Sequence, residues 1–436
     1  MGDKMRPIPF GQLMQWMLSE YRQQGAIFGI EKSQFFRKST TNTVKILDEA
    51  CETALGPAAG PHTQLSQNII SAYLAGGRFL ELKTVQKLDT LEFDKPCIDA
   101  RDEGYNTEWS TELTLKQALH EYINAWFALH VLEALFDLSA TGKRSFIFNM
   151  SIGYDLAGIK LPKMDEFING LIDASGHPVY QSCVAELKQL LADPEFLKGT
   201  DLEGKDWSGV LAQISSEIVS SASLSTMHGC PPDEIESISE YLLTEKKLNT
   251  YVKLNPTLLG YRRVREVLNN LGYEYLGLSE DSFSHDLQYD LAIPMLKRLV
   301  QKAKDYGLTF GVKLSNTLGS RNTLGMLPGD EMYMSGRALF PLTITLAALL
   351  SEEFDGNLPI SYAGGASQLN VQDIFAVGIR PVTLATDMLK PGGYLRMKEM
   401  AELLETMPAP QDDKIDVAKL KTLAEDALSS PLYRKE

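Results

Sequence analysis

Residues 53–84, TALGPAAGPHTQLSQNIISAYLAGGRFLELKT, decide the predicted fold. Two short apolar runs, Ala54–Ala59 and Phe79–Lys83, flank a longer stretch, and a Gly/Pro-rich loop follows the first run. This order is typical of one β–α–β unit of a parallel sheet. Seven further runs predict strands: Phe146–Asn149, Ile218–Leu224, Thr250–Leu254, Tyr275–Leu278, Thr309–Leu314, Pro359–Ala363 and Val382–Ala385.

Eight such units would close a TIM (β/α)8 barrel, and the ninth run leaves the strand count open. Tyr275–Leu278 and Thr309–Leu314 are the two doubtful strands. Between the runs, apolar residues recur at helical spacing, as in Leu115–Leu129 and Leu291–Ala303. We therefore expect an α/β barrel with helices around it.

The chain divides into three expected parts. Residues 1–50 form an N-terminal helical extension, residues 51–400 form the barrel, and residues 401–436 form a linker and one helix around Val417–Leu428. Residues 161–216 are too long for one crossover helix, so we expect a helical insertion there.

Composition excludes several function classes. Lys and Arg number 42 against 57 Asp and Glu, a net charge of −15 that repels nucleic acid and anionic lipid. The most apolar run, Leu339–Leu350, is too short to span a membrane and is broken by Pro341 and two threonines. The four cysteines, Cys51, Cys97, Cys183 and Cys230, are widely spaced, which argues against a disulfide framework or a self-contained iron–sulfur or zinc site. A reducing cytoplasm fits this pattern.

Polar and glycine-rich residues follow the predicted strands, where parallel α/β folds place their sites. They include Ala58-Ala59-Gly60, Glu81, Lys83-Thr84, Asn149, Ser151, Cys230, Lys253, Asn255, Lys313, Asn316-Thr317, Ser335-Gly336, Gly364-Gly365 and Thr386-Asp387. Each alone is more often a turn or a surface residue, but their order around one barrel mouth predicts a pocket.

This ordered series resembles the flavin-binding barrels of the dihydroorotate and dihydropyrimidine dehydrogenase family, over roughly residues 53–390. The segments PAAGPHTQLSQNIISAYLAGGRFLELKTVQ, MHGCPP and AGGASQLNVQDIF are similar to the N-terminal region of the family named "putative selenate reductase subunit". The resemblance implies an FMN-linked oxidoreductase barrel acting on a conjugated or heterocyclic small molecule. It does not identify the substrate, and selenate reduction itself usually needs a different cofactor.

The resemblance assigns roles residue by residue. Cys230, Lys83 and Asn316 form the expected catalytic set, with Cys230 handling a proton. Lysines at strand ends stabilise the anionic reduced flavin, and Lys83 and Lys253 match these positions, although Lys313 competes with Lys253. A surface lysine at a strand end, or a small cysteine packed under a loop, is the simpler alternative.

The remaining expected contacts also come from the resemblance. Asn149, Asn255, Asn316 and Thr317 are expected to bind a heterocyclic substrate, Asn149 also the flavin. Flavin contacts are further expected from Ala58, Ala59, Gly60, Lys83, Thr84, Lys253 and Lys313, and phosphate contacts from Ser335, Gly336, Gly364, Gly365, Thr386 and Asp387. The Asp387 carboxylate would repel a phosphate unless Arg337 or Lys390 compensates.

Two other hypotheses stay open. The first is a flavin-free structural or channelling module, because iron–sulfur clusters, FAD or NAD(P) would need a missing region or a partner; a homodimer is also open. The second is a metal-dependent lyase or hydrolase using His62, His228 and His285 with Glu280 or Asp281, although the spacing is a poor metal motif and we expect no metal.

Overall fold

The computed structural model describes residues 5–88, 94–107, 111–226, 229–323, 325, 327–408, 410 and 413–435. Eight strands pair in parallel in the order β5–β16–β15–β12–β11–β10–β9–β6. Their bounds are β5 (Leu55–Pro57), β6 (Phe79–Glu81), β9 (Ile147–Gly153), β10 (Val219–Ser225), β11 (Asn249–Leu254), β12 (Phe310–Leu314), β15 (Ile360–Tyr362) and β16 (Val382–Leu384).

The sheet closes where its first and last strands meet. The Arg78 backbone N–H, just before β6, donates to the Leu55 carbonyl of β5 at 2.8 Å. A Cβ on Gly56 would lie 1.7 Å from the Phe79 carbonyl oxygen, so only glycine allows this approach. The predicted (β/α)8 barrel is confirmed.

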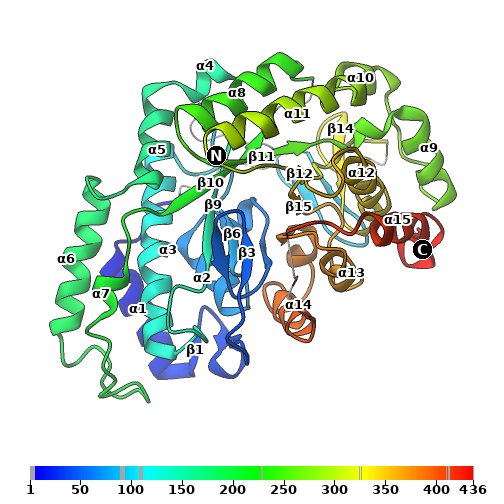
Figure 1. Cartoon of the computed structure of the whole chain (residues 1–436). Helices are drawn as coiled ribbons and strands as arrows, with labels where there is room; N and C mark the ends of the chain where they lie inside the picture. Colours follow the sequence, from blue (N-terminus) through cyan, green and yellow to red (C-terminus); the bar gives the residue numbers. More distant parts are fainter. Residues whose placement is uncertain are drawn as a thin grey trace.

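Helices surround the strands (Figure 1). They include α2 (Ser66–Leu74), α3 (Leu115–Phe136), α8 (Pro232–Thr244), α9 (Tyr261–Asn270), α10 (Glu280–His285), α11 (Tyr289–Asp305), α12 (Phe340–Glu353), α13 (Val371–Ala376) and α14 (Leu395–Glu405). The long helix α3 begins in a capping box: the Gln117 N–H donates to Thr114 Oγ1 at 3.2 Å, and the Thr114 N–H donates to Gln117 Oε1 at 2.9 Å. The apolar spacing predicted both α3 and α11.

One predicted strand was wrong. Thr309–Leu314 contains β12, whereas Tyr275–Leu278 is not a strand of the barrel. Its backbone turns there, since Leu278 N–H donates to the Leu276 carbonyl, and Gly277 makes only an isolated antiparallel bridge to Arg321. Leu276 packs in a second apolar cluster outside the barrel core, which explains its apolar character.

That second cluster lies under a small antiparallel sheet that the sequence did not predict. Its order is β13 (Leu318–Arg321), β14 (Glu331–Ser335), β8 (Gly104–Asn106) and β7 (Ile98–Asp99). These strands have two to five residues each and mix apolar with Gly, Ser, Asn and Glu residues, so their local signal is weak. The sheet pairs residues more than 200 positions apart, such as Tyr333 with Asn106.

Helices also follow β9, in the stretch 161–216 expected to be inserted. They are α5 (Pro162–Ile172), α6 (Pro178–Ala192) and α7 (Val210–Gln213), preceded by the short α4 (Leu156–Ile159). In Figure 1 α5 and α6 lie on the α3 side of the barrel, where α1 (Phe10–Gln24) contacts both α3 and α6. The N-terminal region also forms two hairpins, β1 (Ala26–Ile27) with β2 (Ile30–Glu31) and β3 (Val44–Ile46) with β4 (Glu49–Cys51).

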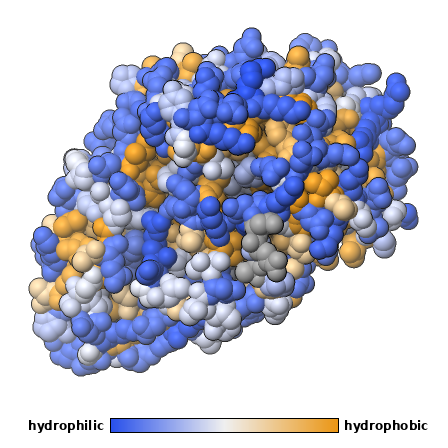
Figure 2. Space-filling model, in the orientation of Figure 1, coloured by the Kyte–Doolittle hydropathy of each residue, from blue (hydrophilic) through white to orange (hydrophobic). Residues whose placement is uncertain are grey.

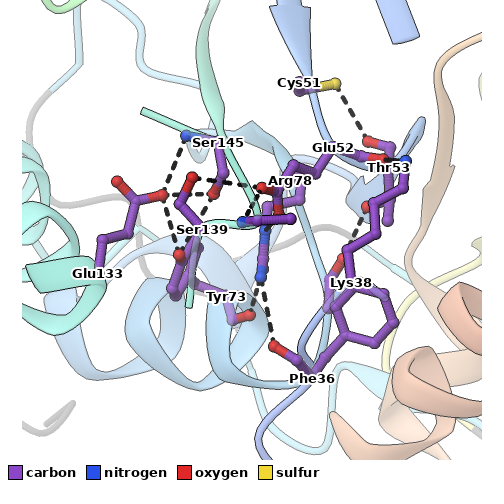
Figure 3. A network of polar contacts seen from close by, with 12 residues as sticks. Phe36, Lys38, Cys51, Glu52, Thr53, Tyr73, Arg78, Glu133, Ser139 and Ser145 are labelled. Atoms are coloured by element: carbon purple, nitrogen blue, oxygen red, sulfur yellow. Dashed lines mark hydrogen bonds and ion pairs between the residues drawn. The ribbon is translucent and has the colours of Figure 1, made fainter. Parts of the chain in front are cut away.

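The amino ends of β5 and β6 hold a buried polar network (Figure 3). Arg78 is fully buried, its Nη1 donates to the Tyr73 carbonyl at 2.7 Å, and its Nε lies 3.7 Å from Glu52 Oε2. The Arg78 guanidinium also lies 4.0 Å from the Tyr73 ring centroid. Glu52 Oε1 accepts from the Ala140 N–H at 2.6 Å. This network closes the barrel end opposite the strand carboxyl ends.

The C-terminal helix α15 (Val417–Ser429) matches the predicted Val417–Leu428 and packs against α12 and α9. Beyond it, the Tyr433 ring lies 4.7 Å from the Phe340 ring. On the face drawn in Figure 2, hydrophilic residues cover most of the surface and apolar patches are scattered. Among the described residues, no helix combines the length and apolar character needed to cross a membrane.

Candidate active site

Two adjoining cavities lie at the carboxyl ends of the barrel strands. The inner cavity has about 710 Å³ of empty space and the outer cavity about 1560 Å³, both including their open mouths. Ala59, Thr84, Ser225, Lys253 and Thr317 line both, so the two are continuous. Every one of the eight strands, or the loop directly after it, contributes to the inner cavity. This is the place where TIM barrels hold their active sites.

Most of the predicted site residues line these cavities. The inner cavity alone is lined by Ala58, Lys313, Ser335, Gly336, Gly364, Gly365 and Thr386. The outer cavity alone is lined by Gly60, Lys83 and Asn316. Both cavities are lined by Ala59, Thr84, Lys253 and Thr317. Cys230, Asn149, Asn255 and Asp387 line neither.

The charged residues among those described in the lining of the cavities are all positively charged. They are Lys83, Lys253 and Lys313, and no Asp or Glu is among the described residues that line either cavity. In a chain of net charge −15, acidic residues would be expected at random in so large a surface. Such a wall favours an anionic ligand.

The backbones of Lys253 and Lys313 lie side by side in adjacent strands. They are direct partners in the parallel pair of β11 and β12, so both side chains point to the same face of the sheet. Lys253 is half-buried and borders both cavities, whereas Lys313 is 3% exposed and borders only the inner one.

Lys313 forms an ion pair with Glu81 of β6, a fully buried strand-end residue to which the sequence alone assigned no specific role. The Lys313 ammonium also donates to Thr383 Oγ1 at 3.3 Å. Glu81 Oε2 accepts from the Ala59 N–H at 3.2 Å, and Glu81 Oε1 accepts from Ser223 Oγ at 3.4 Å. The carboxylate therefore holds both Lys313 and the first loop. Its position two residues before Lys83 was the only sequence signal.

Lys83 lines the outer cavity just after β6 and is 5% exposed. Its Nζ donates to Thr111 Oγ1 at 3.1 Å, and its carbonyl accepts from the Tyr122 hydroxyl at 3.1 Å. Next to it, the Thr84 and Ser151 hydroxyls lie 2.7 Å apart and both line the inner cavity. Ser151 belongs to the predicted strand-end series, but the sequence alone assigned it no specific role.

Glycines bring backbone close to the inner cavity after β15. A Cβ on Gly364 would lie 2.2 Å from Thr343 Oγ1, and one on Gly365, whose φ is +78°, would lie 2.4 Å from the Phe340 nitrogen. Gly336, with φ of +76°, and Thr386 complete this wall. A side chain at either Gly364 or Gly365 would displace these neighbours, so the cavity wall here is main chain.

The small antiparallel sheet covers the cavity mouth. Asn106 of β8 and its partner Tyr333 of β14 line the outer cavity. At the other end of this pairing, Ser335 Oγ accepts from Thr386 Oγ1 at 2.8 Å. Neither Asn106 nor Tyr333 was predicted, because only the long-range pairing brings them to the site.

The predicted asparagines divide into two groups. Asn316 lines the outer cavity, and its Oδ1 accepts from the Thr317 N–H at 3.0 Å. Asn149 is fully buried in the barrel, where its Nδ2 donates to Ser223 Oγ at 2.9 Å and its Oδ1 accepts from Ser221 Oγ at 2.8 Å.

Asn255 instead supports the loop after β10. Its Nδ2 donates to Asp286 Oδ2 at 3.2 Å, and Asp286 Oδ1 accepts from the Gly229 N–H at 2.8 Å. The expected ring contacts of Asn149 and Asn255 stay predictions, and in this structure both amides bind protein groups.

Cys230 lies in that same loop and is partly buried. Burial first, and then the nearby Glu234 and Asp155 carboxylates, raise the pKa of its thiol to about 11. The thiol is therefore protonated at neutral pH and suits a proton donor better than a base. Its predicted catalytic role stays a prediction, because the loop places it outside the lining of both cavities.

Asp387 pairs with neither Arg337 nor Lys390, the two basic residues expected from the sequence to compensate its charge. Arg396 binds it through two hydrogen bonds, of 3.0 and 2.9 Å. Arg337 instead binds the Asp102 carboxylate, and Lys390 Nζ donates to the Asp102 carbonyl at 2.6 Å. The charge of Asp387 is thus offset within the protein. Asp387 and Arg396 line a separate cavity of about 580 Å³ behind Gly336 and Thr386.

The histidines of the metal hypothesis have different surroundings. His62 is buried, which lowers the pKa of its imidazole to about 4, and its carbonyl accepts from the Tyr394 hydroxyl at 2.9 Å. His285 is exposed beside Asp281, and His228 lies outside the described residues. Within the described ranges, no three His, Cys, Asp or Glu residues are grouped as metal ligands would be.

A protein-family model described as "Oxidoreductase YgfK, N-terminal TIM-barrel domain" matches residues 28–435. The chain belongs to this family. Two relatives named "Putative oxidoreductase YgfK", from Escherichia coli strain K12 and from Escherichia coli O157:H7, are each 57% identical over 437 residues. The match covers the whole of this chain and 42% of each relative. The chain therefore spans less than half the length of these relatives.

Among solved structures, a crystal structure of DHODH in complex with ferulenol from Eimeria tenella is similar with a TM-score of 0.43 and 12% identity, over 95% of each chain. The family match agrees with the oxidoreductase barrel expected from the sequence. The narrower resemblance to the selenate reductase subunit stays a prediction.

Proposed function

We propose that this chain is an FMN-dependent oxidoreductase barrel that acts on a conjugated or heterocyclic small molecule. The observation that carries the proposal is the lining of the two cavities, which combines three lysines with no carboxylate among its described residues. FMN carries a phosphate and supplies hydride transfer at its ring N5 atom. The FMN phosphate and the anionic ring of the reduced flavin both suit a cationic, glycine-rich cavity.

Residues of the inner cavity would hold the cofactor. Lys253 is the better candidate for the flavin lysine, because it borders both cavities, whereas Lys313 borders only the inner one. The main chain of Gly364 and Gly365 and the Thr386 hydroxyl would bind the phosphate. With Arg396 on Asp387, that carboxylate does not oppose a phosphate at this wall.

Substrate would enter through the outer cavity. There, Asn106 and Asn316 offer amide donors and acceptors, and Tyr333 offers an aromatic surface. Cys230 would give up its thiol proton, in keeping with its raised pKa. It would act where the loop after β10 approaches the outer cavity, which Thr226 of that loop lines.

Electrons would reach this barrel from elsewhere. We propose that iron–sulfur clusters and an FAD or NAD(P) site belong to the further length of the relatives or to a partner subunit. In support, the four cysteines are free, and the described residues hold no group of three metal ligands. Free thiols also fit the reducing cytoplasm that we propose as the compartment.

A visible absorption spectrum tests the proposal. The purified chain, after incubation with excess FMN and gel filtration, should retain about one flavin per chain and release it on denaturation. The Lys253→Met variant should retain much less. Wild-type protein that folds, yet retains no flavin under these conditions, would contradict the proposed function.

A further inference from the structure

Glu81 and Lys313 span the barrel interior. β6 and β12 are four strands apart in either direction around the barrel, so they lie on opposite sides of it. The ion pair between their side chains therefore crosses the interior beneath the inner cavity, which Lys313 lines. A buried ion pair is not needed for stability, since apolar residues of similar volume usually do as well. Its place at the floor of the cavity suggests a functional reason.

Both charges are well satisfied by neighbouring groups. Glu81 accepts from Ala59 and Ser223 in addition to Lys313, and Lys313 also donates to Thr383. These contacts fix the carboxylate in one place. Because Ala59 lines both cavities, Glu81 also holds the first loop in place at the cavity wall.

Glu81 also offsets one of three positive charges around the cavity. Lys253 and Lys313 are direct neighbours in the sheet, and two uncompensated ammonium groups there would repel each other. With the Glu81 carboxylate in place, the charge of Lys313 is offset and the Glu81–Lys313 pair is neutral as a whole.

We propose that Glu81 is a positioning residue that holds Lys313 at the cavity floor and cancels its charge, and so sets how strongly the cavity prefers an anion. This inference rests on the proposed function in one respect: the anion that matters is the reduced flavin. A more positive wall favours the reduced, anionic form over the oxidised form and raises the midpoint potential.

The test is a charge cycle on the FMN-loaded chain. Glu81→Gln should raise the midpoint potential, Lys313→Met should lower it, and the double variant should return close to wild type. We expect at least a tenfold change in the relative affinity for reduced over oxidised flavin in each single variant, which is about 30 mV for a two-electron couple. Shifts of the same sign in both single variants, or no shift, would overturn the proposal.

A second measurement does not need flavin. On flavin-free protein at pH 6.5, calorimetric titration with benzoate, a planar carboxylate, should give a dissociation constant at least tenfold lower for Glu81→Gln than for Lys313→Met. Equal constants would overturn the proposal. If wild-type protein binds no flavin but these constants differ as expected, the proposed function fails and the role of Glu81 stands.

Two controls separate an effect on the cavity from a failure of a variant to fold. The double variant has no buried charge at this position, so it should fold even if one single variant does not, and comparison with the remaining single variant and wild type still gives the sign of the effect. The buried pair Arg78 and Glu52 at the other barrel end is the matched control. The variant Glu52→Gln/Arg78→Met should leave the potential and the benzoate constant unchanged.

Discussion

Lys253 and Lys313 are direct cross-strand partners in β11 and β12, and only Lys313 forms an ion pair with Glu81. The two lysines follow the same V-K-L pattern in the sequence, which cannot separate them. The structure distinguishes them, because the Glu81 carboxylate reaches Lys313 from the opposite side of the barrel. Lys253 borders both cavities, while Lys313 borders only the inner one and its charge is offset by Glu81.

Replacing Lys253 by Met should therefore weaken FMN binding at least tenfold, about 1.4 kcal/mol. The reason is the loss of a cation that borders both cavities. Quenching of FMN fluorescence on titration measures the dissociation constant. Lys297→Met removes an exposed lysine of α11 and serves as control. Equal constants for the two variants would show that Lys253 does not contact the cofactor.

Replacing Gly56 by Ala should open the barrel seam. The new Cβ would lie 1.7 Å from the Phe79 carbonyl oxygen, so β5 and β6 must move apart. We expect a loss of about 3 kcal/mol in the free energy of unfolding, measured in urea. The control is Gly176→Ala, because a Cβ there meets nothing within 4 Å. A Gly56→Ala variant as stable as this control would contradict the tight seam.

Replacing Arg78 by Met should cost about 3–5 kcal/mol, because the buried Glu52 carboxylate would lose its charged partner. Adding Glu52→Gln should recover most of this loss. Denaturant unfolding of the two single variants and the double variant gives the coupling energy. Additive losses would mean that the two side chains do not stabilise each other.

Stability should fall below pH 6.5 because of His130. Burial first, and then the charge of Arg144, lower the pKa of its imidazole to about 3. The unfolded chain, with an ordinary pKa near 6.5, binds the proton more readily between pH 6.5 and 3. The folded state therefore loses up to about 1.4 kcal/mol per pH unit as the pH falls through this window.

His130→Leu should flatten this slope, since Leu can pack against Trp126 and Phe146 without a titratable group. Urea unfolding between pH 7 and 5 measures the slope. Leu132→Met, a volume-conserving change in the same helix, should keep the wild-type slope. An unchanged slope in His130→Leu would assign the acid sensitivity to other groups.

Most of the barrel could be predicted from the sequence, because a parallel strand buried on both faces is a continuous apolar run. Eight of the nine predicted strands are barrel strands. Tyr275–Leu278 failed because its apolar residues serve the second cluster. The antiparallel sheet was missed because its strands are held by pairing over long sequence distances, such as Ser335 with Gly104.

The place of the cavities at the carboxyl ends of the strands could also be predicted, whereas the roles of the residues there stay predictions. Residues that follow a strand, such as Lys83, Lys253 and Gly364, line the cavities because strand ends meet at one barrel mouth. Residues whose loop takes a longer path are harder to place, and Cys230 and Asn255 lie outside the lining.

The sequence by itself determined the barrel fold, the segments that form its eight strands and the cationic residues at their carboxyl ends, because these depend on local apolar runs and on the residues that end them. Only the tertiary structure decided which charges meet. Glu81 and Lys313 are 232 positions apart, and Asp387 takes Arg396 instead of Arg337 or Lys390. Such pairings depend on barrel closure and loop paths, which bring together residues with no relation along the chain.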